Sequence, residues 1–258
     1  MANDLAVAKF SNLNDPLNKL LVCYQSDDSL GAKRVLGGAR EVINFYSGIF
    51  GRPKHYQGYT VIEIPDGWGS QASHFYFLQT AAAFKESSRI GEVYHEIGHS
   101  WNVTASPSVK RCRYFDEAFA SYFESLPIRR FEGEQRFKEE MEKSRTAFVR
   151  WAKNDQKVFE TPIAEYGKEE LGRHSYTKGS WSLYVLNQIV GDERFALIVR
   201  TMIAEFGDKA IDFAGFQTMS ERISKRSLKK FFDEWIYGTE SSKLLVDSAP
   251  IINIVKRY

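Results

Sequence analysis

Cysteine is almost missing from this sequence. Cys23 and Cys112 are the only two among 258 residues, and no C-x-x-C pair occurs. Neither a disulfide framework nor a cysteine-based zinc ribbon is therefore expected. A long apolar run is also missing, and the N-terminal residues lack the basic start and uninterrupted apolar stretch of a secretory signal. We accordingly expect no membrane-spanning segment and take the cytoplasm as the default location.

An excess of charge of one sign is missing as well. Lysine and arginine number 35 and aspartate and glutamate 33, which gives a formal net charge of +2. This balance creates no extended field for nucleic acid or a membrane surface, so we expect neither as a partner. The chain does contain 43% hydrophobic residues over 258 positions. It is therefore long enough to bury a substantial core, as one large domain or two lobes, and its oligomeric state stays open.

One short motif carries most of the chemical information. The sequence His95-Glu96-Ile97-Gly98-His99 places two imidazoles four residues apart. On a helix both would lie on one face and bind one metal ion. Glu96 would project beside them toward a water molecule, which is the arrangement of zinc hydrolases.

The segment around this motif has the pattern of a partly buried helix. Apolar residues recur at helical spacing along it: Ile90, Val93, Tyr94, Ile97 and Trp101. They predict an amphipathic helix that packs into a core, with Ser87 or Ser88 as its N-terminal cap. The alternative is a pair of buried, hydrogen-bonded histidines without a metal, and Glu96 between them argues against it.

A second predicted helix, residues 114–124 with the sequence YFDEAFASYFE, supplies a third ligand. Glu117, Ala120, Ser121 and Glu124 would share one face, and the two small residues would let this helix approach the first one closely. A catalytic zinc typically takes three protein ligands and leaves one position for water. The two histidines and Glu117 fill that number. Glu117 as a solvated carboxylate at a helix start is the alternative, but Asp116 fits that capping role better.

These two segments resemble a known family. The strings HEIGHSWNV and YFDEAFASYFE are similar to the catalytic core of the gluzincin zinc metallopeptidases, in particular the aminopeptidase N family. In that family a helix with H-E-x-x-H precedes a second helix with N-E-G-F-A-S-Y. The His-x-Trp-Asn-Val part is also similar to the glycyl aminopeptidase family. Seventeen residues separate His99 from Glu117, one fewer than in the aminopeptidase N pattern, and the difference falls in a connecting loop.

The resemblance assigns a role to each site residue. It implies one zinc ion bound by His95, His99 and Glu117, with Glu96 as the general base toward a zinc-activated water. Glu124 is a candidate for orienting a ligand histidine from behind.

A third segment, residues 175–183 with the sequence SYTKGSWSL, is similar to the family's Y-E-K-G-A segment. This likeness implies that Tyr176 donates a hydrogen bond to the oxyanion formed from the scissile carbonyl. A phenol suits the role because it stays a neutral donor near pH 7.

The resemblance implies an α+β fold in which residues 1–258 form a single thermolysin-like catalytic domain. Its small N-terminal mixed sheet lobe, residues 1–84, would precede a mainly helical lobe, residues 85–258, that contains the zinc site. The sequence pattern predicts three further elements: a helix over Leu30 to Phe50 and strands over Tyr59 to Pro65 and Phe75 to Thr80. The resemblance also implies a helix over Ser227 to Trp235 that closes the catalytic domain.

One departure from the family concerns the substrate. In the aminopeptidase branch a G-x-M-E-N segment supplies a glutamate that binds the substrate's N-terminal ammonium. The corresponding residues 67–74 have the sequence GWGSQASH, and no acidic residue occurs between Asp66 and Glu86. Because a buried ammonium needs a carboxylate partner, aminopeptidase activity on peptides is implied by the resemblance alone.

Three alternatives therefore stay open. The first is an endopeptidase, and the second is a hydrolase of another small amide or an epoxide, each with the same zinc site. The third is a non-catalytic domain in which zinc only braces two helices, although structural zinc sites are usually closed by four protein ligands.

The remaining histidines and one basic cluster are interpreted as ordinary. We expect surface or hydrogen-bonded side chains at the other three histidines: His55, His74 and His174. A basic cluster near the proposed site is interpreted as surface decoration: Lys110, Arg111 and Arg113.

Overall fold

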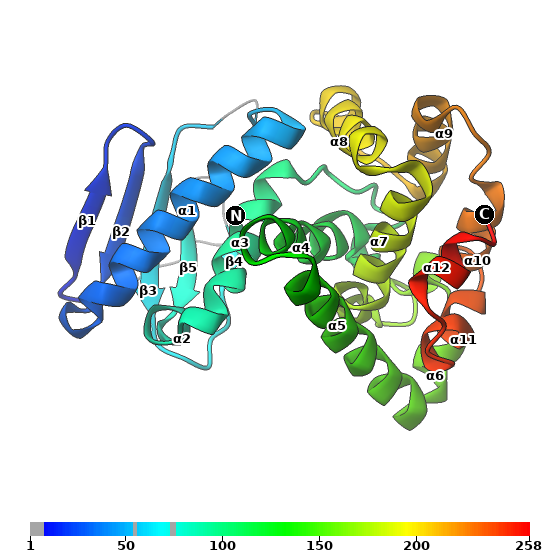
Figure 1. Ribbon diagram of the computed structural model, residues 1–258, viewed down its shortest axis with the longest axis horizontal. Helices are drawn as coiled ribbons and strands as arrows, with labels where there is room; N and C mark the ends of the chain where they lie inside the picture. The colour runs from blue at the N-terminus through cyan, green and yellow to red at the C-terminus, as the bar shows by residue number, and fades with distance from the viewer. Residues whose placement is uncertain (1–7, 54–55, 73–75) are drawn as a thin grey trace. The chain divides into compact units, whose positions relative to one another are not determined.

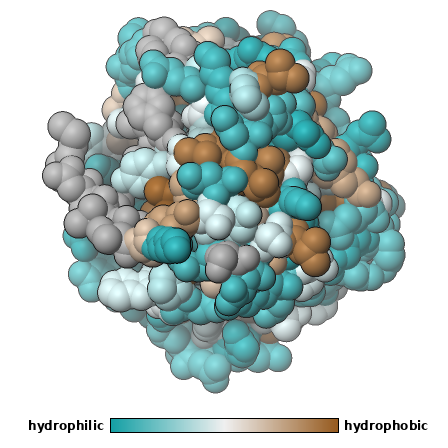
Figure 2. All heavy atoms as spheres, turned by 90° about the vertical axis from the view of Figure 1, so that its left-hand side faces the viewer, coloured by the Kyte–Doolittle hydropathy of each residue, from teal (hydrophilic) through white to brown (hydrophobic). Residues whose placement is uncertain are grey.

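The computed structural model describes residues 8–53, 56–72 and 76–258. It divides into two compact units, Met1–Ser100 and Trp101–Tyr258. None of the helices in the described ranges is long and apolar enough to cross a membrane. On the face drawn in Figure 2, hydrophobic side chains lie in small groups among hydrophilic ones, the ordinary pattern of a water-exposed surface.

A five-stranded mixed sheet organises the first unit. Its strands are β1 (Ser11–Asp15), β2 (Leu20–Tyr24), β3 (Tyr59–Ile64), β4 (Gln71–Ala72) and β5 (Tyr76–Thr80). They lie in the order β1-β2-β3-β5-β4 (Figure 1), with parallel pairing of β3 to β2 and β5 and antiparallel pairing at both ends. The helix α1 (Ser29–Phe50) connects β2 to β3, which is the crossover that a parallel pair requires.

One face of this sheet is buried. Burial alternates along β2 and β3, as expected for strands with one face on a core. Val61 lies beside Val22 on one side and Phe77 on the other, and none of the three is exposed. Helix α1 lies across the sheet and packs on β2 (Figure 1). A Cβ atom at Gly31 would lie 1.9 Å from the Phe84 carbonyl oxygen, so α1 meets the short helix α2 (Ala81–Lys85) where only glycine fits.

The helix of the histidine motif completes the first unit. It is α3 (Ile90–Gly98), preceded by a 3-10 turn, η2 (Ser87–Arg89), and followed by another, η3 (His99–Trp101). Val93 and Ile97 are fully buried, as is Trp101, the first residue of the second unit, whereas Ile90 is half-buried. The predicted apolar stripe is therefore confirmed except at its first residue. The Tyr46 hydroxyl of α1 donates to the carbonyl of Tyr94 at 3.2 Å and so fixes α3 one residue before the first histidine.

The predicted cap of this helix was wrong. Ser87 and Ser88 lie in the 3-10 turn, and the residue that directly precedes α3, Arg89, makes no side-chain cap hydrogen bond. The turn satisfies part of the helix start through backbone bonds instead, as Ile90 N–H donates to the Ser87 carbonyl.

The second unit is helical. Its elements are η4 (Lys110–Cys112), η5 (Tyr114–Ala118), α4 (Phe119–Glu132), α5 (Glu134–Asn154), α6 (Gln156–Glu160), η6 (Ile163–Glu165), η7 (Gly172–Tyr176), α7 (Lys178–Val190), α8 (Asp192–Phe206), α9 (Phe213–Ser224), α10 (Lys229–Trp235), α11 (Glu240–Val246) and α12 (Ile251–Val255). Helix α7 is buried on nearly every side and forms the centre of the unit. Aromatic rings fill the space beside it: Tyr114 lies 5.2 Å from Phe213, and Phe115 lies 5.7 Å from Phe216, between ring centroids.

The predicted fold class is confirmed, with a small N-terminal mixed sheet and a mainly helical remainder. The helix over Leu30 to Phe50 and the strand from Tyr59 match α1 and β3. The predicted closing helix corresponds to α10, which two further short helices, α11 and α12, follow. The sequence pattern did not predict β1, β2 or β4, and Phe75 lies outside the described residues.

Candidate metal centre

Two histidines on successive helical turns form the core of the candidate site. His95 lies in α3, and His99 begins η3 four residues later. Their ring centroids are 4.9 Å apart and the ring planes make an angle of 84°. Both imidazoles therefore lie on one face, as the spacing predicts. Glu96 beside them is buried, with 7% of its surface exposed.

Glu117 lies in a single turn of π-helix. This turn, η5, directly precedes α4, and such turns occur frequently at functional sites. The backbone N–H groups of Glu117 and Ala118 both donate to the carbonyl of Arg113, at 3.1 and 3.3 Å. Glu117 is 5% exposed, which excludes the alternative of a solvated carboxylate.

The predicted capping role of Asp116 was wrong. Asp116 lies inside the π turn, and the residue that precedes α4 is Ala118. The Asp116 carboxylate instead accepts the N–H of Glu117 at 2.7 Å, through Oδ1.

The donor set fits one metal ion. His95, His99 and Glu117 each offer a ligand atom, and these atoms all lie within 4.8 Å of one another. Donors around a tetrahedral zinc sit about 2.0 to 2.2 Å from the ion and hence roughly 3.4 Å from each other. Within the described residues no second group of three or more histidine, cysteine or acidic side chains meets the same criterion.

Tyr176 reaches Glu117 from another element. It ends η7, and its hydroxyl is hydrogen-bonded to the Glu117 carboxylate. Burial, followed by that hydrogen bond and by the charge of Glu117, raises the pKa of Tyr176, so the phenol is a neutral donor near pH 7. A Cβ atom at Gly179 would lie 2.6 Å from the Cβ of Ala118. Glycine therefore permits the start of α7, next to Tyr176, to approach the Glu117 turn.

Arg113 is a site residue that the sequence analysis misinterpreted. Its Nε donates to Asp116 Oδ2 at 2.7 Å, and its Nη2 donates to Glu117 Oε1. The interpretation as an ordinary surface charge is correct for Arg111, whose guanidinium pairs with the exposed Glu170. It is wrong for Arg113, which pairs with the buried Glu117. The spacings of three and four residues to the two carboxylates are the sequence signal that points to these pairs.

Lys178 is a second residue whose environment was not predicted. It begins α7 and is completely buried. Its Nζ donates to Ser242 Oγ at 2.9 Å and to the Thr161 carbonyl at 3.4 Å. Burial lowers the pKa of Lys178 to about 7. An amine in a site without a carboxylate partner among the described residues is costly to charge.

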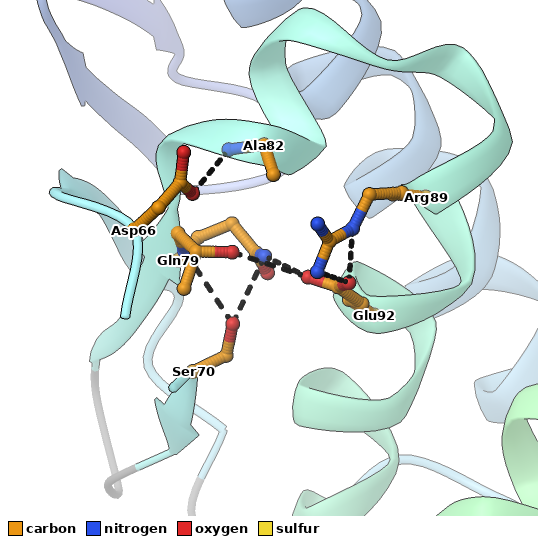
Figure 3. A network of polar contacts seen from close by, with 7 residues as sticks. Asp66, Ser70, Gln79, Ala82, Arg89 and Glu92 are labelled. Atoms are coloured by element: carbon orange, nitrogen blue, oxygen red, sulfur yellow. Dashed lines mark hydrogen bonds and ion pairs between the residues drawn. The ribbon is translucent and has the colours of Figure 1, made fainter. Parts of the chain in front are cut away.

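A polar network joins the segment before β4 to α3 (Figure 3). The buried Gln79 amide donates to Ser70 Oγ and to Glu92 Oε2, each at 3.0 Å. The Thr80 hydroxyl also donates to Glu92 Oε2 at 3.3 Å, and Arg89 Nε donates to Oε1 at 2.6 Å. Both oxygens of Glu92 therefore have partners. The network ties the edge of the sheet to the helix that carries the histidine motif.

The remaining predicted residues are placed as follows. Glu124 lies in α4 and is half-buried. His174 is fully buried, its Nε2 accepts from Arg173 at 3.5 Å, and burial lowers its pKa to about 4. It is a neutral hydrogen-bonded histidine, as predicted. His55 and His74 lie outside the described residues.

Comparison with known proteins bears on the whole site. The sequence profile of the Peptidase family M1 domain matches residues 71–235, a range that contains every proposed site residue. A search of curated proteins gives no match. Among solved structures, a point mutant of the M1 zinc metallopeptidase from Deinococcus radiodurans has a TM-score of 0.62 at 17% identity, over 88% of this chain and 48% of that one.

A second solved structure has a similar fold. Native leukotriene A4 hydrolase from Saccharomyces cerevisiae has a TM-score of 0.74 at 16% identity, over 89% of this chain and 39% of the yeast chain. The chain thus spans 48% of the Deinococcus protein and 39% of the yeast protein. At these low identities the structural similarity shows a shared fold alone.

Proposed function

The chain belongs to peptidase family M1, and on that premise we propose that it hydrolyses peptide bonds with one zinc ion bound by His95, His99 and Glu117. The observation that carries the proposal is the approach of the three ligand atoms to within 4.8 Å. A peptide is also the ligand in one similar structure, the Deinococcus metallopeptidase mutant bound to a Tyr-Ser-Ala substrate. We propose that residues 1–258 act together as one thermolysin-like catalytic domain.

Glu96 is the proposed general base. Zinc, when bound, would lower the pKa of water to about 7 and polarise the scissile carbonyl. The Glu96 carboxylate would accept the proton of the attacking water and transfer it to the leaving amine nitrogen. Its position between the two ligand histidines keeps it near the metal without making it a ligand. Glu124 is the proposed support of a ligand histidine, through a hydrogen bond that fixes the ring.

Tyr176 is the proposed donor to the oxyanion. Tyr176→Phe should lower kcat by about 10²- to 10³-fold, because one hydrogen bond aimed at the developing charge is lost. KM should change little, since the bond strengthens only as the carbonyl becomes tetrahedral. Steady-state kinetics at saturating zinc measure both constants. An unchanged kcat would remove Tyr176 from the mechanism.

Two kinds of peptidase are compatible with this site. Aminopeptidase activity is proposed from the family. Endopeptidase activity is the second candidate, because residues 67–85 contain no acidic side chain for a substrate ammonium. The carboxylate of Glu92, which the polar network ties to this segment, is a poor substitute as a partner for a substrate ammonium. Both of its oxygens already accept hydrogen bonds, from Arg89, Gln79 and Thr80.

Mass spectrometry of one peptide mixture separates these candidates. The peptides are supplied with free and with acetylated N-termini to zinc-loaded protein, and the Glu96→Gln variant is the control. Trimming of the free peptides alone is expected of an aminopeptidase, and internal cleavage of both forms is expected of an endopeptidase. Absence of any Glu96-dependent cleavage would contradict peptide hydrolysis. It would leave a non-peptide hydrolase or a zinc-braced binding domain.

A further inference from the structure

One guanidinium group bridges two carboxylates at the third proposed ligand. Arg113 binds Asp116 through Nε and Glu117 through Nη2. We propose that Arg113, neutralised by Asp116, is a positioning residue that fixes the direction of the Glu117 carboxylate for zinc. The inference rests on the proposed function, because it takes Glu117 as a zinc ligand.

Arg113 holds the Glu117 carboxylate from one side. Its Nη2 contacts Oε1 of Glu117. The guanidinium is a rigid planar group and Asp116 binds its Nε, so the direction from which Nη2 meets Oε1 of Glu117 is fixed. The Glu117 side chain is 7% exposed while that of Arg113 is 46% exposed. Because one partner is buried, solvent and salt screen this ion pair less than they would screen a fully exposed pair.

The backbone of Arg113 serves the same turn. Arg113 has φ 57° and ψ 25°, the left-handed region that non-glycine residues rarely adopt. In this conformation its carbonyl accepts both N–H groups that close the π turn, those of Glu117 and Ala118. One residue thus holds Glu117 by its backbone and by its side chain. Strained conformations of this kind persist where surrounding bonds determine them, and they cluster at functional sites.

Asp116 removes the electrostatic penalty of this arrangement. A lone arginine beside a divalent cation would repel it. The Asp116 carboxylate lies 2.7 Å from Arg113 Nε, so the pair adds no net charge beside Glu117. Asp116 is itself held in place, because its Oδ1 accepts the N–H of Glu117 and its carbonyl accepts the Asn102 side-chain amide at 3.0 Å. The pair therefore contributes orientation without weakening the attraction for zinc.

The charge-neutral double variant Arg113→Met/Asp116→Asn tests this role. Its net charge equals that of the wild type, so a change in zinc affinity reports the loss of orientation. The dissociation constant for zinc, measured by competition with a chromogenic chelator, should rise about 10- to 100-fold. The matched control is Arg111→Met/Glu170→Gln, which removes an exposed ion pair of the same unit and should leave zinc affinity unchanged.

Two further variants separate the possible outcomes. Arg113→Lys keeps the charge and the fold but lacks the planar guanidinium, and it should also weaken zinc binding. Glu117→Gln removes the proposed ligand. Weak zinc binding by Glu117→Gln together with wild-type affinity in both Arg113 variants would overturn the positioning role alone. Wild-type affinity in Glu117→Gln would overturn the proposed zinc site itself.

Discussion

Glu96→Gln should lower kcat by about 10²- to 10⁴-fold while zinc binding is retained. The amide has nearly the shape of the carboxylate but cannot accept the proton of the attacking water. The side chain sits between two proposed ligands without being one of them, so the donor set for zinc is unchanged. Glu96 is buried in α3, where a charged side chain is costly. A neutral amide of nearly the same shape should therefore also fold normally.

Parallel measurements make this result specific. Zinc content and kcat are determined for the wild type, for Glu96→Gln and for Glu41→Gln, an equal change of charge on the exposed side of α1. The control should match the wild type in both quantities. Equal loss of zinc and activity in Glu96→Gln would make Glu96 a ligand or a structural residue. Full activity would exclude it as the base.

The part of the site that follows from local sequence could be predicted. His95 and His99 are four residues apart, and the apolar residues around them have helical spacing, so one helix and one metal-binding face follow directly. Glu117 was predicted from the number of ligands that a catalytic zinc requires and from its face of the second helix. Its burial and its approach to the histidines agree with that reasoning.

The remaining features depend on contacts or conformations that sequence patterns do not report. The left-handed backbone of Arg113 is set by the π turn that follows it. A glycine at this position would have indicated a positive φ angle, but an arginine does not. The strands β1 and β2 pair with each other, but their position at the edge of a mixed sheet depends on the distant β3. Lysine is rarely buried, so its usual preference predicts a surface position for Lys178.

Tyr176 lies between these cases. A tyrosine before a helix is an ordinary packing residue, and only the likeness of its segment to the family pattern selects it. The structure adds a hydrogen bond from its hydroxyl to Glu117 and a glycine contact that brings α7 to the Glu117 turn. The same short segment holds Lys178, two residues further on, on the buried side.

Burial of Lys178 should make stability depend on pH. The lysine pKa is 10.5 in its unperturbed state and about 7 in the folded protein. Between these values the unfolded chain binds the proton and the folded protein does not. The free energy of unfolding should therefore rise with pH from about 7 to about 10.5, and below 7 the full cost of the buried charge remains.

The size of this effect follows from the same two values. Between pH 6.5 and 9.5 the lysine contributes a change of about 3 kcal/mol, because each unit of pKa difference corresponds to about 1.4 kcal/mol over the part of the window that is crossed. The Nζ contacts with Ser242 and Thr161 are to neutral oxygens, so they do not offset the cost of charging as a carboxylate would. The rings of Phe148 and Tyr166 lie 5.9 and 5.8 Å from Nζ and add only a weak attraction for the cation.

Urea unfolding of the wild type and of Lys178→Met at pH 6.5 and 9.5 measures this contribution. Other titrating groups affect both proteins equally, so the difference between their unfolding free energies isolates Lys178. That difference should shift by about 3 kcal/mol in favour of the wild type at the higher pH. The control is Lys153→Met, which changes an exposed lysine of α5. The difference in unfolding free energy between the wild type and this variant should be the same at both pH values. A constant difference for Lys178→Met as well would mean that the amine is charged at both pH values, and that the interior solvates it better than its neutral partners indicate.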